Sequence, residues 1–265
     1  STPATQVTPL LIRTPGDSPG ANFGNRYHSG MIDLKTKPAR PLVLPSILAA
    51  DFTRLGDDVA DVLDQGADGI HVDIMDGHFV PNLSMGPPVM ASLRKRFPDA
   101  YFDVHLMVTN PEDFVSPFVE AGADHITFHI EATAGRKQHH EFDLIEQIKA
   151  TGCTAGVSFN PPTTAASVQH LVGHVEMFLA MSVHPGFGGQ QFIPDVLEKI
   201  RELTAQFPTL GDTRMEIDGG VGPDNVAQVV AAGVDMVVAG SAVFGADDRA
   251  AAIAAIHAAV TPEAR

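Results

Sequence analysis

The sequence contains few cysteines and few basic residues, and it lacks any long apolar run. One cysteine, Cys153, excludes a disulfide within the chain and suits a reducing compartment. The 17 Lys and Arg are outnumbered by 32 Asp and Glu, and the net charge of −15 argues against nucleic acids and anionic membranes as partners. No apolar stretch approaches the ~20 residues of a membrane span, and the first residues lack the apolar core of a secretory signal. We therefore expect a cytoplasmic protein that binds neither membranes nor nucleic acid.

Apolar residues are plentiful enough for a large core, but they are unevenly distributed. Hydrophobic residues make up 44% of the 265 positions, which fits one large α/β barrel as well as two small domains. Residues 1–40 are instead rich in Pro, Thr, Ser and Gly and show no apolar periodicity. We interpret 1–40 as a disordered leader or extension, with a targeting remnant or an oligomer-contacting arm as the alternative. Residues 41–265 are then expected to form a single folded domain.

From Pro41 onward, short β-branched runs alternate with amphipathic helical stretches, as in a parallel βα repeat. The expected strands are Leu42–Ser46, Gly69–Asp73, Ala100–Met107, His125–Ile130, Thr154–Phe159, Met177–Val183, Arg214–Asp218 and Met236–Ala239. The expected helices are Thr53–Gln65, Pro87–Phe97, Pro111–Ala121, Phe142–Thr151, Thr163–Val172, Pro194–Phe207, Pro223–Ala231 and Asp247–Val260. Four helices are followed by a glycine of the kind that ends helices in the left-handed conformation, at Gly66, Gly122, Gly152 and Gly233.

Eight strands alternating with eight helices predict a (β/α)₈ TIM barrel. An open, doubly wound sheet is the competing architecture. It normally has a glycine-rich turn after its first strand, whereas the first strand here ends in Pro45-Ser46. The barrel is therefore the better prediction.

Histidine and aspartate side chains gather at the expected strand ends, where a barrel of this kind places its active site. His71 and Asp73 lie two residues apart and so point to the same side of one strand. His105 ends the third strand and Asp218 the seventh. Two imidazoles and two carboxylates could converge on one divalent cation, and this mixed set suits Zn²⁺, Fe²⁺ or Mn²⁺, with Co²⁺ as a further candidate. Alternatively, each histidine only satisfies a neighbouring carboxylate, but four such groups at one end of three strands favour a metal site.

Asp73 and Asp218 are also candidates for an acid–base pair. The second and seventh strands lie on different sides of an eight-stranded ring, so these carboxylates should face each other across the pocket. One on each face of a substrate carbon suits a two-base reaction, in which one removes a proton and the other delivers one. A nearby cation would stabilise the enediolate that forms between these steps.

Glycines follow the last three strands, as Gly186-Phe187-Gly188-Gly189, Gly219-Gly220 and Gly240-Ser241. Their backbone N–H groups could bind a phosphate without Lys or Arg, which is compatible with the acidic net charge. Three methionines fall at or just beyond strand ends, at Met75, Met107 and Met181. They either fill the core or form a polarizable lining for a planar intermediate. His129, at the end of the fourth strand, is expected to be structural.

Five segments of the chain resemble ribulose-phosphate 3-epimerases: Pro45–Phe52, His71–Asn82, Asp103–Met107, His184–Gln190 and Asp218–Gly220. The resemblance extends from Leu42 to about Val260. It implies a metal-dependent (β/α)₈ barrel of the ribulose-phosphate-binding type. It also implies a carbohydrate isomerase that interconverts D-ribulose 5-phosphate and D-xylulose 5-phosphate in the pentose phosphate pathway.

Applied to this chain, the resemblance implies His71, Asp73, His105 and Asp218 as metal ligands, with the two aspartates as the acid–base pair. It implies that Ser46 and His105 contact the sugar, that the glycine segments with Phe187 and Ser241 hold substrate and phosphate, and that the three methionines line the intermediate. A homo-oligomer is expected. His184 departs from the family motif, which has Asn or Glu there, and could alter the pH profile or the preference among ketose phosphates.

Three other functions are compatible with parts of this pattern. An epimerase of a six-carbon ketose phosphate, such as D-allulose 6-phosphate, would use the same chemistry, because the sequence does not determine the length of the pocket. A non-catalytic phosphosugar-binding barrel would predict a broken ligand set, and the set here is complete. A related decarboxylase or aldolase would carry a lysine at a strand end, and none of the expected strand ends has one.

Overall fold

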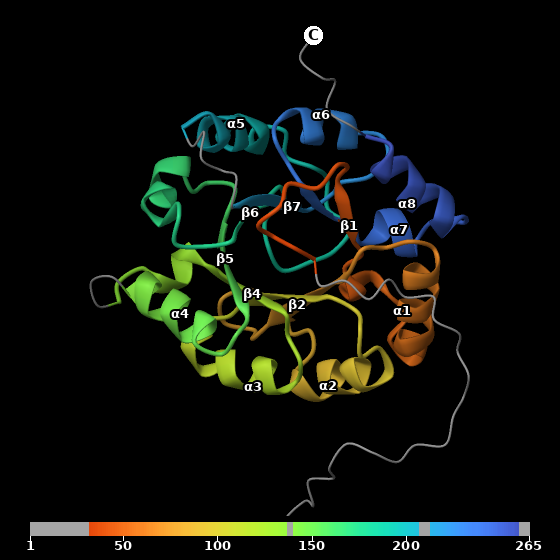
Figure 1. Cartoon of the computed structure of the whole chain (residues 1–265), viewed down its shortest axis with the longest axis horizontal. Helices are drawn as coiled ribbons and strands as arrows, with labels where there is room; N and C mark the ends of the chain where they lie inside the picture. Colours follow the sequence, from red (N-terminus) through yellow and green to blue (C-terminus); the bar gives the residue numbers. More distant parts are fainter. Residues whose placement is uncertain (1–31, 137–139, 207–212, 260–265) are drawn as a thin grey trace, which may run out of the picture.

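Eight parallel strands form a ring that is surrounded by helices in the computed structural model, which describes residues 32–136, 140–206 and 213–259 (Figure 1). The strands are β1 (Leu42–Leu44), β2 (Ile70–Met75), β3 (Phe102–Met107), β4 (His125–His129), β5 (Thr154–Phe159), β6 (Met177–Met181), β7 (Arg214–Asp218) and β8 (Met236–Val238). Nearly every strand residue is buried, as expected for a parallel sheet covered on both faces.

The ring closes between the first and second strands. The sheet order is β1-β8-β7-β6-β5-β4-β3-β2. Backbone hydrogen bonds then join the two ends, from Asp68 N–H to the Val43 carbonyl at 2.9 Å and from His71 N–H to the Pro45 carbonyl at 3.1 Å. The predicted (β/α)₈ barrel is therefore confirmed, and its strands all point to the same mouth.

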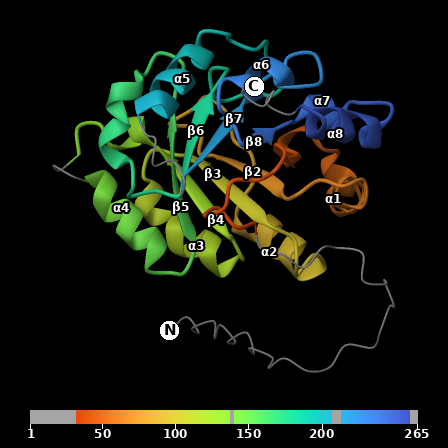
Figure 2. The same cartoon turned by 45° about the horizontal axis from the view of Figure 1, so that its top comes forward.

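The outer layer consists of eight α-helices in the described residues, visible around the ring in both views (Figures 1 and 2). They are α1 (Leu55–Asp64), α2 (Pro87–Arg96), α3 (Val115–Glu120), α4 (His140–Lys149), α5 (Val196–Gln206), α6 (Val226–Ala231), α7 (Ser241–Phe244) and α8 (Arg249–His257). The four glycines expected to end helices have φ angles of 100° at Gly66, 100° at Gly122, 93° at Gly152 and 108° at Gly233, which confirms that prediction. Within the described residues, no helix has the length and apolar character needed to cross a membrane.

The structure differs from the sequence prediction at several element boundaries. The helix expected over Thr163–Val172 is replaced by two 3₁₀ turns, Ala165–Ser167 and Gln169–Leu171, because Thr, Ser and Val in this short segment favour helices weakly. Strand β2 continues to Met75 instead of ending at Asp73, and the short helix α7 was not expected. Phe207 and Val260, the expected last residues of two helices, lie outside the described residues.

Residues 32–40 pack against the barrel, unlike the disordered leader expected over 1–40. Leu34 is buried in a cluster with Leu44, Tyr101, Met177 and Met236. Arg214, fully buried at the start of β7, donates a hydrogen bond of 2.7 Å from Nε to the Leu34 carbonyl. This segment therefore covers the N-terminal end of the barrel. The rest of the expected leader, residues 1–31, lies outside the described residues.

One carboxylate, that of Asp68, connects this segment to the barrel and to the last helix. Both its oxygens accept from the Arg40 guanidinium, at 2.9 and 3.0 Å, and one also accepts from Val43 N–H at 2.8 Å. His257 at the end of α8 adds a contact of 2.8 Å through Nε2. Burial alone would raise the pKa of Asp68, but the bonds from His257, Arg40 and Val43 outweigh it and lower the pKa.

We expect Asp68→Asn to lower the free energy of unfolding by about 2–4 kcal/mol at pH 7, because it leaves several partly buried donors unpaired. The lowered pKa means that the carboxylate stabilises the fold above its unfolded pKa of about 4 and loses this effect as the pH falls. The difference between the variant and the wild type should therefore shrink in acid. Urea denaturation of the variant and the wild type at pH 7 and at pH 3 measures this difference, with the exposed Asp99→Asn as the control. An equal difference at pH 7 and pH 3 would contradict the assignment.

Candidate active site

The pairing of β2 with β3 arranges the candidate site in rows. His71 pairs with Asp103, Asp73 with His105, and Met75 with Met107. Alternate strand residues point the same way, so all six side chains belong to the inner face of the barrel. The imidazoles and carboxylates lie deeper inside the barrel, and the two methionines lie nearest its C-terminal mouth.

The four predicted ligands converge on one region. The Asp73 Oδ1 atom lies 3.2 Å from His71 Nε2 and 3.1 Å from His105 Nδ1. Asp218, from the end of β7, places Oδ2 3.9 Å from the same nitrogen of His105. One donor atom from each residue can be chosen so that all four lie within 4.8 Å of one another. Donors that share a small divalent cation with bonds of about 2.1 Å are about 3–3.5 Å apart when adjacent and about 4.2 Å apart when opposite, so small side-chain movements would bring the four donors onto one such ion.

The two aspartates of this cluster differ in protonation. Burial alone would raise the pKa of Asp73, but the charge and hydrogen bonds of His71 and His105 outweigh it and hold the pKa well below the usual range. Burial and the nearby Asp73 carboxylate raise the pKa of Asp218 to about 7. Near neutral pH, Asp73 is therefore ionised, while Asp218 is protonated in about half of the molecules, so that one acid and one base are available for a two-base reaction.

The two histidines also differ. Burial lowers the pKa of His105 to about 4, although its hydrogen bond to the Asp73 carboxylate acts in the opposite direction, so this imidazole is neutral. Burial acts in the same direction on His71, but the carboxylates of Asp73 and Asp103 outweigh it and raise its pKa well above the usual value. Without a cation, His71 therefore carries the positive charge that partly balances the acidic cluster.

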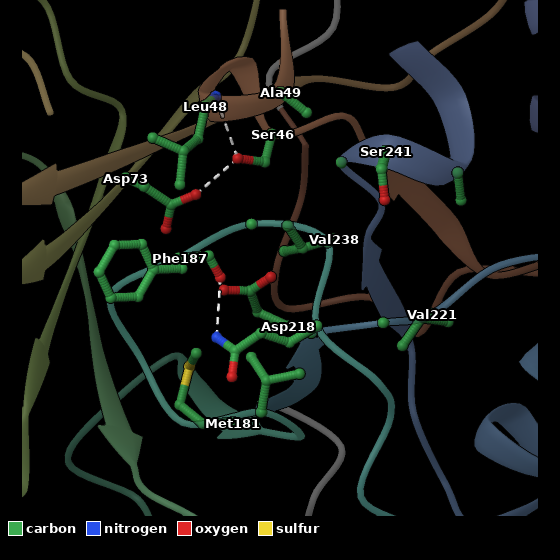
Figure 3. A pocket seen from close by; sticks show the side chains of 18 of the residues that line it. Ser46, Leu48, Ala49, Asp73, Met181, Phe187, Asp218, Val221, Val238 and Ser241 are labelled. Atoms are coloured by element: carbon green, nitrogen blue, oxygen red, sulfur yellow. Dashed lines mark hydrogen bonds between the residues drawn. The ribbon is translucent and has the colours of Figure 1, made fainter. Parts of the chain in front are cut away.

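A pocket of about 450 Å³ opens above this cluster at the C-terminal mouth of the barrel. Figure 3 shows Asp73 and Asp218 with their carboxyl groups turned into it, and Ser46 donating to Asp73 Oδ2 at 2.5 Å. The pocket brings together fourteen of the predicted site residues: Ser46, Asp73, Met75, Met107, Met181, Gly186, Phe187, Gly188, Gly189, Asp218, Gly219, Gly220, Gly240 and Ser241. None of the described residues that line it is Lys or Arg.

His71 and His105 do not line the pocket. Both side chains are fully buried beneath Asp73, on the inner face of the barrel. This position suits a metal ligand below the pocket, and the expected contact of His105 with the sugar stays a prediction. His184 is exposed, and its carbonyl accepts from Gln190 Nε2 at 2.7 Å.

Glycine is required by sterics at the turn after β7. Gly219 has a φ of 122°, and a Cβ there would lie 2.6 Å from the Val183 side chain. Gly220 has a φ of 63°, and a Cβ would lie 2.7 Å from the backbone nitrogen of Phe192. The two glycines let the chain turn directly at the pocket wall, so that backbone lines the pocket in place of side chains.

Two buried carboxyl groups were missed by the sequence analysis. Asp103 Oδ2 lies 2.6 Å from His71 Nδ1, and Glu216, two residues before Asp218, is fully buried with neither oxygen hydrogen-bonded within the described part of the chain. Burial and the nearby Asp103 carboxylate raise the pKa of Glu216 well above its usual value. The signal was available in the sequence, because each residue precedes a predicted ligand by two positions on the same strand face.

In essentially every characterised enzyme of this architecture, the active site lies at the C-terminal ends of the strands, where this cluster and pocket are found. The fold and the buried cluster together place the chain in the class of (β/α)₈-barrel enzymes with a site suited to a divalent metal ion. Within that class, the chain belongs to the ribulose-phosphate 3-epimerase family, whose model matches residues 42–244.

Individual relatives agree with this family. A ribulose-phosphate 3-epimerase of Mycobacterium tuberculosis is 49% identical over 218 residues, covering 82% of this chain and 92% of its own. The enzyme of the same name from Escherichia coli K12 is 48% identical over 208 residues, covering 78% and 90%. Among solved structures, KGPDC from Streptococcus mutans has a TM-score of 0.60 at 15% identity, covering 82% of this chain and 95% of its own, which supports the fold alone.

Proposed function

We propose that the chain catalyses the metal-dependent 3-epimerisation of D-ribulose 5-phosphate to D-xylulose 5-phosphate. The observation that carries the proposal is the pair Asp73 and Asp218, which face one pocket from β2 and β7 with pKa values shifted in opposite directions. The names of the relatives supply the substrate.

The reaction moves one proton at C3. The adjacent C2 carbonyl acidifies this proton, and the ionised Asp73 removes it to form an enediolate. Protonated Asp218 then delivers a proton to the opposite face of C3, which inverts the carbon. The two groups exchange roles in the reverse direction. Ser46 donates to Asp73 Oδ2 and so keeps this carboxylate oriented towards the pocket.

His71, Asp73, His105 and Asp218 would hold the divalent cation. When bound, the ion would supply positive charge that stabilises the negative enediolate. Two neutral imidazoles and two carboxylates suit Zn²⁺, Fe²⁺, Mn²⁺ or Co²⁺. Met75, Met107 and Met181 all line the pocket, where they provide a polarizable wall for the planar intermediate.

The phosphate is proposed to bind at the turns around Gly219-Gly220 and Gly240-Ser241. These turns line the same pocket and present backbone close to its surface. With no Lys or Arg among the described lining residues, peptide N–H groups are the donors that suit a phosphate here. The loop at Gly186 forms another wall, and the Asn82 side chain holds it by donating to the Gly186 carbonyl at 2.7 Å.

We expect kcat/KM for D-ribulose 5-phosphate to exceed that for D-allulose 6-phosphate by about 100-fold. With the phosphate anchored at the glycine turns, an additional carbon moves C3 away from the two aspartates, and a displacement of about 1 Å can cost this much. Both sugars should be assayed in deuterated solvent, with label at C3 reporting proton transfer and phosphate-free D-ribulose as the control. Equal kcat/KM values would favour the six-carbon alternative, and absence of exchange with both sugars would contradict an epimerase.

The expected cytoplasmic location and homo-oligomer stay predictions.

A further inference from the structure

Two loops from opposite sides of the barrel meet at its mouth. The β2 loop (residues 76–86) and the β6 loop (residues 182–195) follow strands that lie four places apart in the eight-stranded ring. Asn82 in the β2 loop donates from Nδ2 to the carbonyl of Gly186 in the β6 loop at 2.7 Å. The loops are also packed together, because a Cβ on Gly186 would lie 3.5 Å from the Val80 side chain. The two sides of the mouth are therefore in direct contact.

The β2 loop is well anchored to the barrel. Oδ1 of Asp76 accepts from the backbone N–H groups of His78 and Phe79, both at 2.8 Å. Its Oδ2 accepts from the N–H of Thr109, which follows β3, at 2.7 Å. One carboxylate thus ties the β2 loop both to itself and to the neighbouring strand end. Asn82 therefore projects from a supported turn.

The part of the β6 loop that lines the pocket, residues 185–189, has fewer anchors. Gln190 Nε2 donates to the carbonyls of His184 and Phe187 at 2.7 and 2.8 Å, but these bonds lie within the loop. In the part of the chain that the structure describes, the bond from Asn82 is the only hydrogen bond between residues 185–189 and another element. Phe187 is 56% exposed although it lines the pocket. The position of this wall therefore depends on Asn82.

We propose that Asn82 is a positioning residue that holds residues 185–189 over the pocket and so restricts the access of water to the reacting carbon. Asn82 is not among the described residues that line the pocket, and it acts through Gly186. Figure 3 shows Phe187, from this wall, at the same pocket as the Asp73 carboxyl group. The inference rests on the proposed function and deepens it, because a proton taken up by Asp73 exchanges with solvent only if water reaches it.

Asn82→Asp removes this contact and little else. The new carboxylate keeps an oxygen that can accept from Leu83 N–H, as Oδ1 of Asn82 does at 2.9 Å. Its other oxygen replaces the amide donor and faces the Gly186 carbonyl, which can only accept. Asn82→Ala removes the donor without adding charge. Asn110→Asp, in the loop after β3, is the matched control, because the side chain there accepts from Arg136 and an aspartate would accept as well.

Limited proteolysis tests the position of the wall without any substrate. Chymotrypsin cleaves after a Phe residue only when the surrounding backbone can leave its folded position. We expect cleavage after Phe187, identified by mass spectrometry, to be about 10-fold faster in both Asn82 variants than in the wild type, because one hydrogen bond restrains the segment. Asn110→Asp should match the wild type. Cleavage after Phe52, which is 52% exposed in a different loop, should be equal in all four proteins.

Isotope exchange tests the consequence for the reaction. In deuterated solvent, deuterium enters C3 of recovered D-ribulose 5-phosphate when the abstracted proton exchanges before it returns. The ratio of this exchange to epimerisation should rise about 10-fold in both Asn82 variants and be unchanged in Asn110→Asp. A general loss of stability would not change the ratio, because both rates scale with the amount of folded enzyme. Mn²⁺ affinity, measured by competition with a chelator, should be unchanged, since the hydrogen bonds of Asn82 involve none of the four candidate ligands.

The role of Asn82 and the proposed function can fail separately. Unchanged cleavage after Phe187, or an unchanged exchange ratio, in the folded Asn82 variants would overturn the role of Asn82 even in an active epimerase. Absence of both exchange and epimerisation in the wild type would contradict the proposed function. The cleavage rates would then still decide whether Asn82 holds the wall in place.

Discussion

Asp218→Asn should reduce kcat for epimerisation by about 10³–10⁴-fold and abolish proton delivery to one face of C3. Asn keeps an oxygen that can contact a cation, but it cannot donate or accept the proton. Asp73 is unchanged in this variant, so solvent exchange at C3 should persist for the epimer whose proton faces Asp73. Quenched-flow assays with both sugars in deuterated solvent measure the two faces separately. Near-wild-type turnover by Asp218→Asn would contradict the two-base mechanism.

The same variant should be more stable than the wild type when metal is removed. Burial and repulsion by Asp73 raise the pKa of Asp218 to about 7, far above the unfolded value. Because the folded state holds this proton more tightly than the unfolded state does, the group destabilises the fold increasingly as the pH rises from the unfolded pKa of about 4 to the folded pKa of about 7. At pH 8, the free energy of unfolding of the metal-free Asp218→Asn variant should therefore exceed that of the metal-free wild type by about 1–3 kcal/mol. Asp224→Asn, an exposed residue lining the same pocket, is the control for both activity and stability.

The fold was predictable because parallel strands and their helix-ending glycines have local signals. Buried strands appear as short β-branched runs, and the four left-handed glycines occur where a helix must turn back to the sheet. The packing of residues 32–40 was missed because it depends on contacts far apart in sequence. The bond from Arg214 to the Leu34 carbonyl joins residues 180 positions apart, and a single buried leucine leaves no periodicity to detect.

The candidate site was predictable where its residues end strands, since all strands of the barrel end at one mouth. His71, Asp73, His105 and Asp218 could be brought together from topology alone. His129 is expected to be structural, and its position in the sequence reveals neither its contact with His105 nor its contact with Glu131. Glu131 is held by Asn160 and Thr163 from the segment after β5. Such contacts depend on side-chain directions, which strand periodicity does not specify.

Removal of the cation should abolish epimerisation, with at least about 10³-fold loss of kcat, and a single equivalent of a divalent ion should restore it. The cluster explains the size of the effect. It holds two carboxylates on the buried face of the pocket, with no Lys or Arg among the described lining residues. Without the ion, none of the described residues that line the pocket carries a full positive charge, and the charge of His71 lies below the pocket. Dialysis against a chelator, followed by titration with Zn²⁺, Fe²⁺, Mn²⁺ and Co²⁺, measures both the loss and the preferred ion.

Binding should also stabilise the fold, because the ion binds the folded cluster and has no comparable site in the unfolded chain. An ion at about 1,000 times its dissociation constant adds about 4 kcal/mol, which corresponds to a rise in Tm of about 10 °C for a chain of this size. Protons compete for the same atoms, since the pKa of His71 is raised and that of Asp218 is about 7. Affinity should therefore increase as the pH rises from 6 to 8. Asp73→Asn should lose most of this thermal shift, whereas Asp224→Asn should keep it, and a full shift in Asp73→Asn would mean that the ion binds elsewhere.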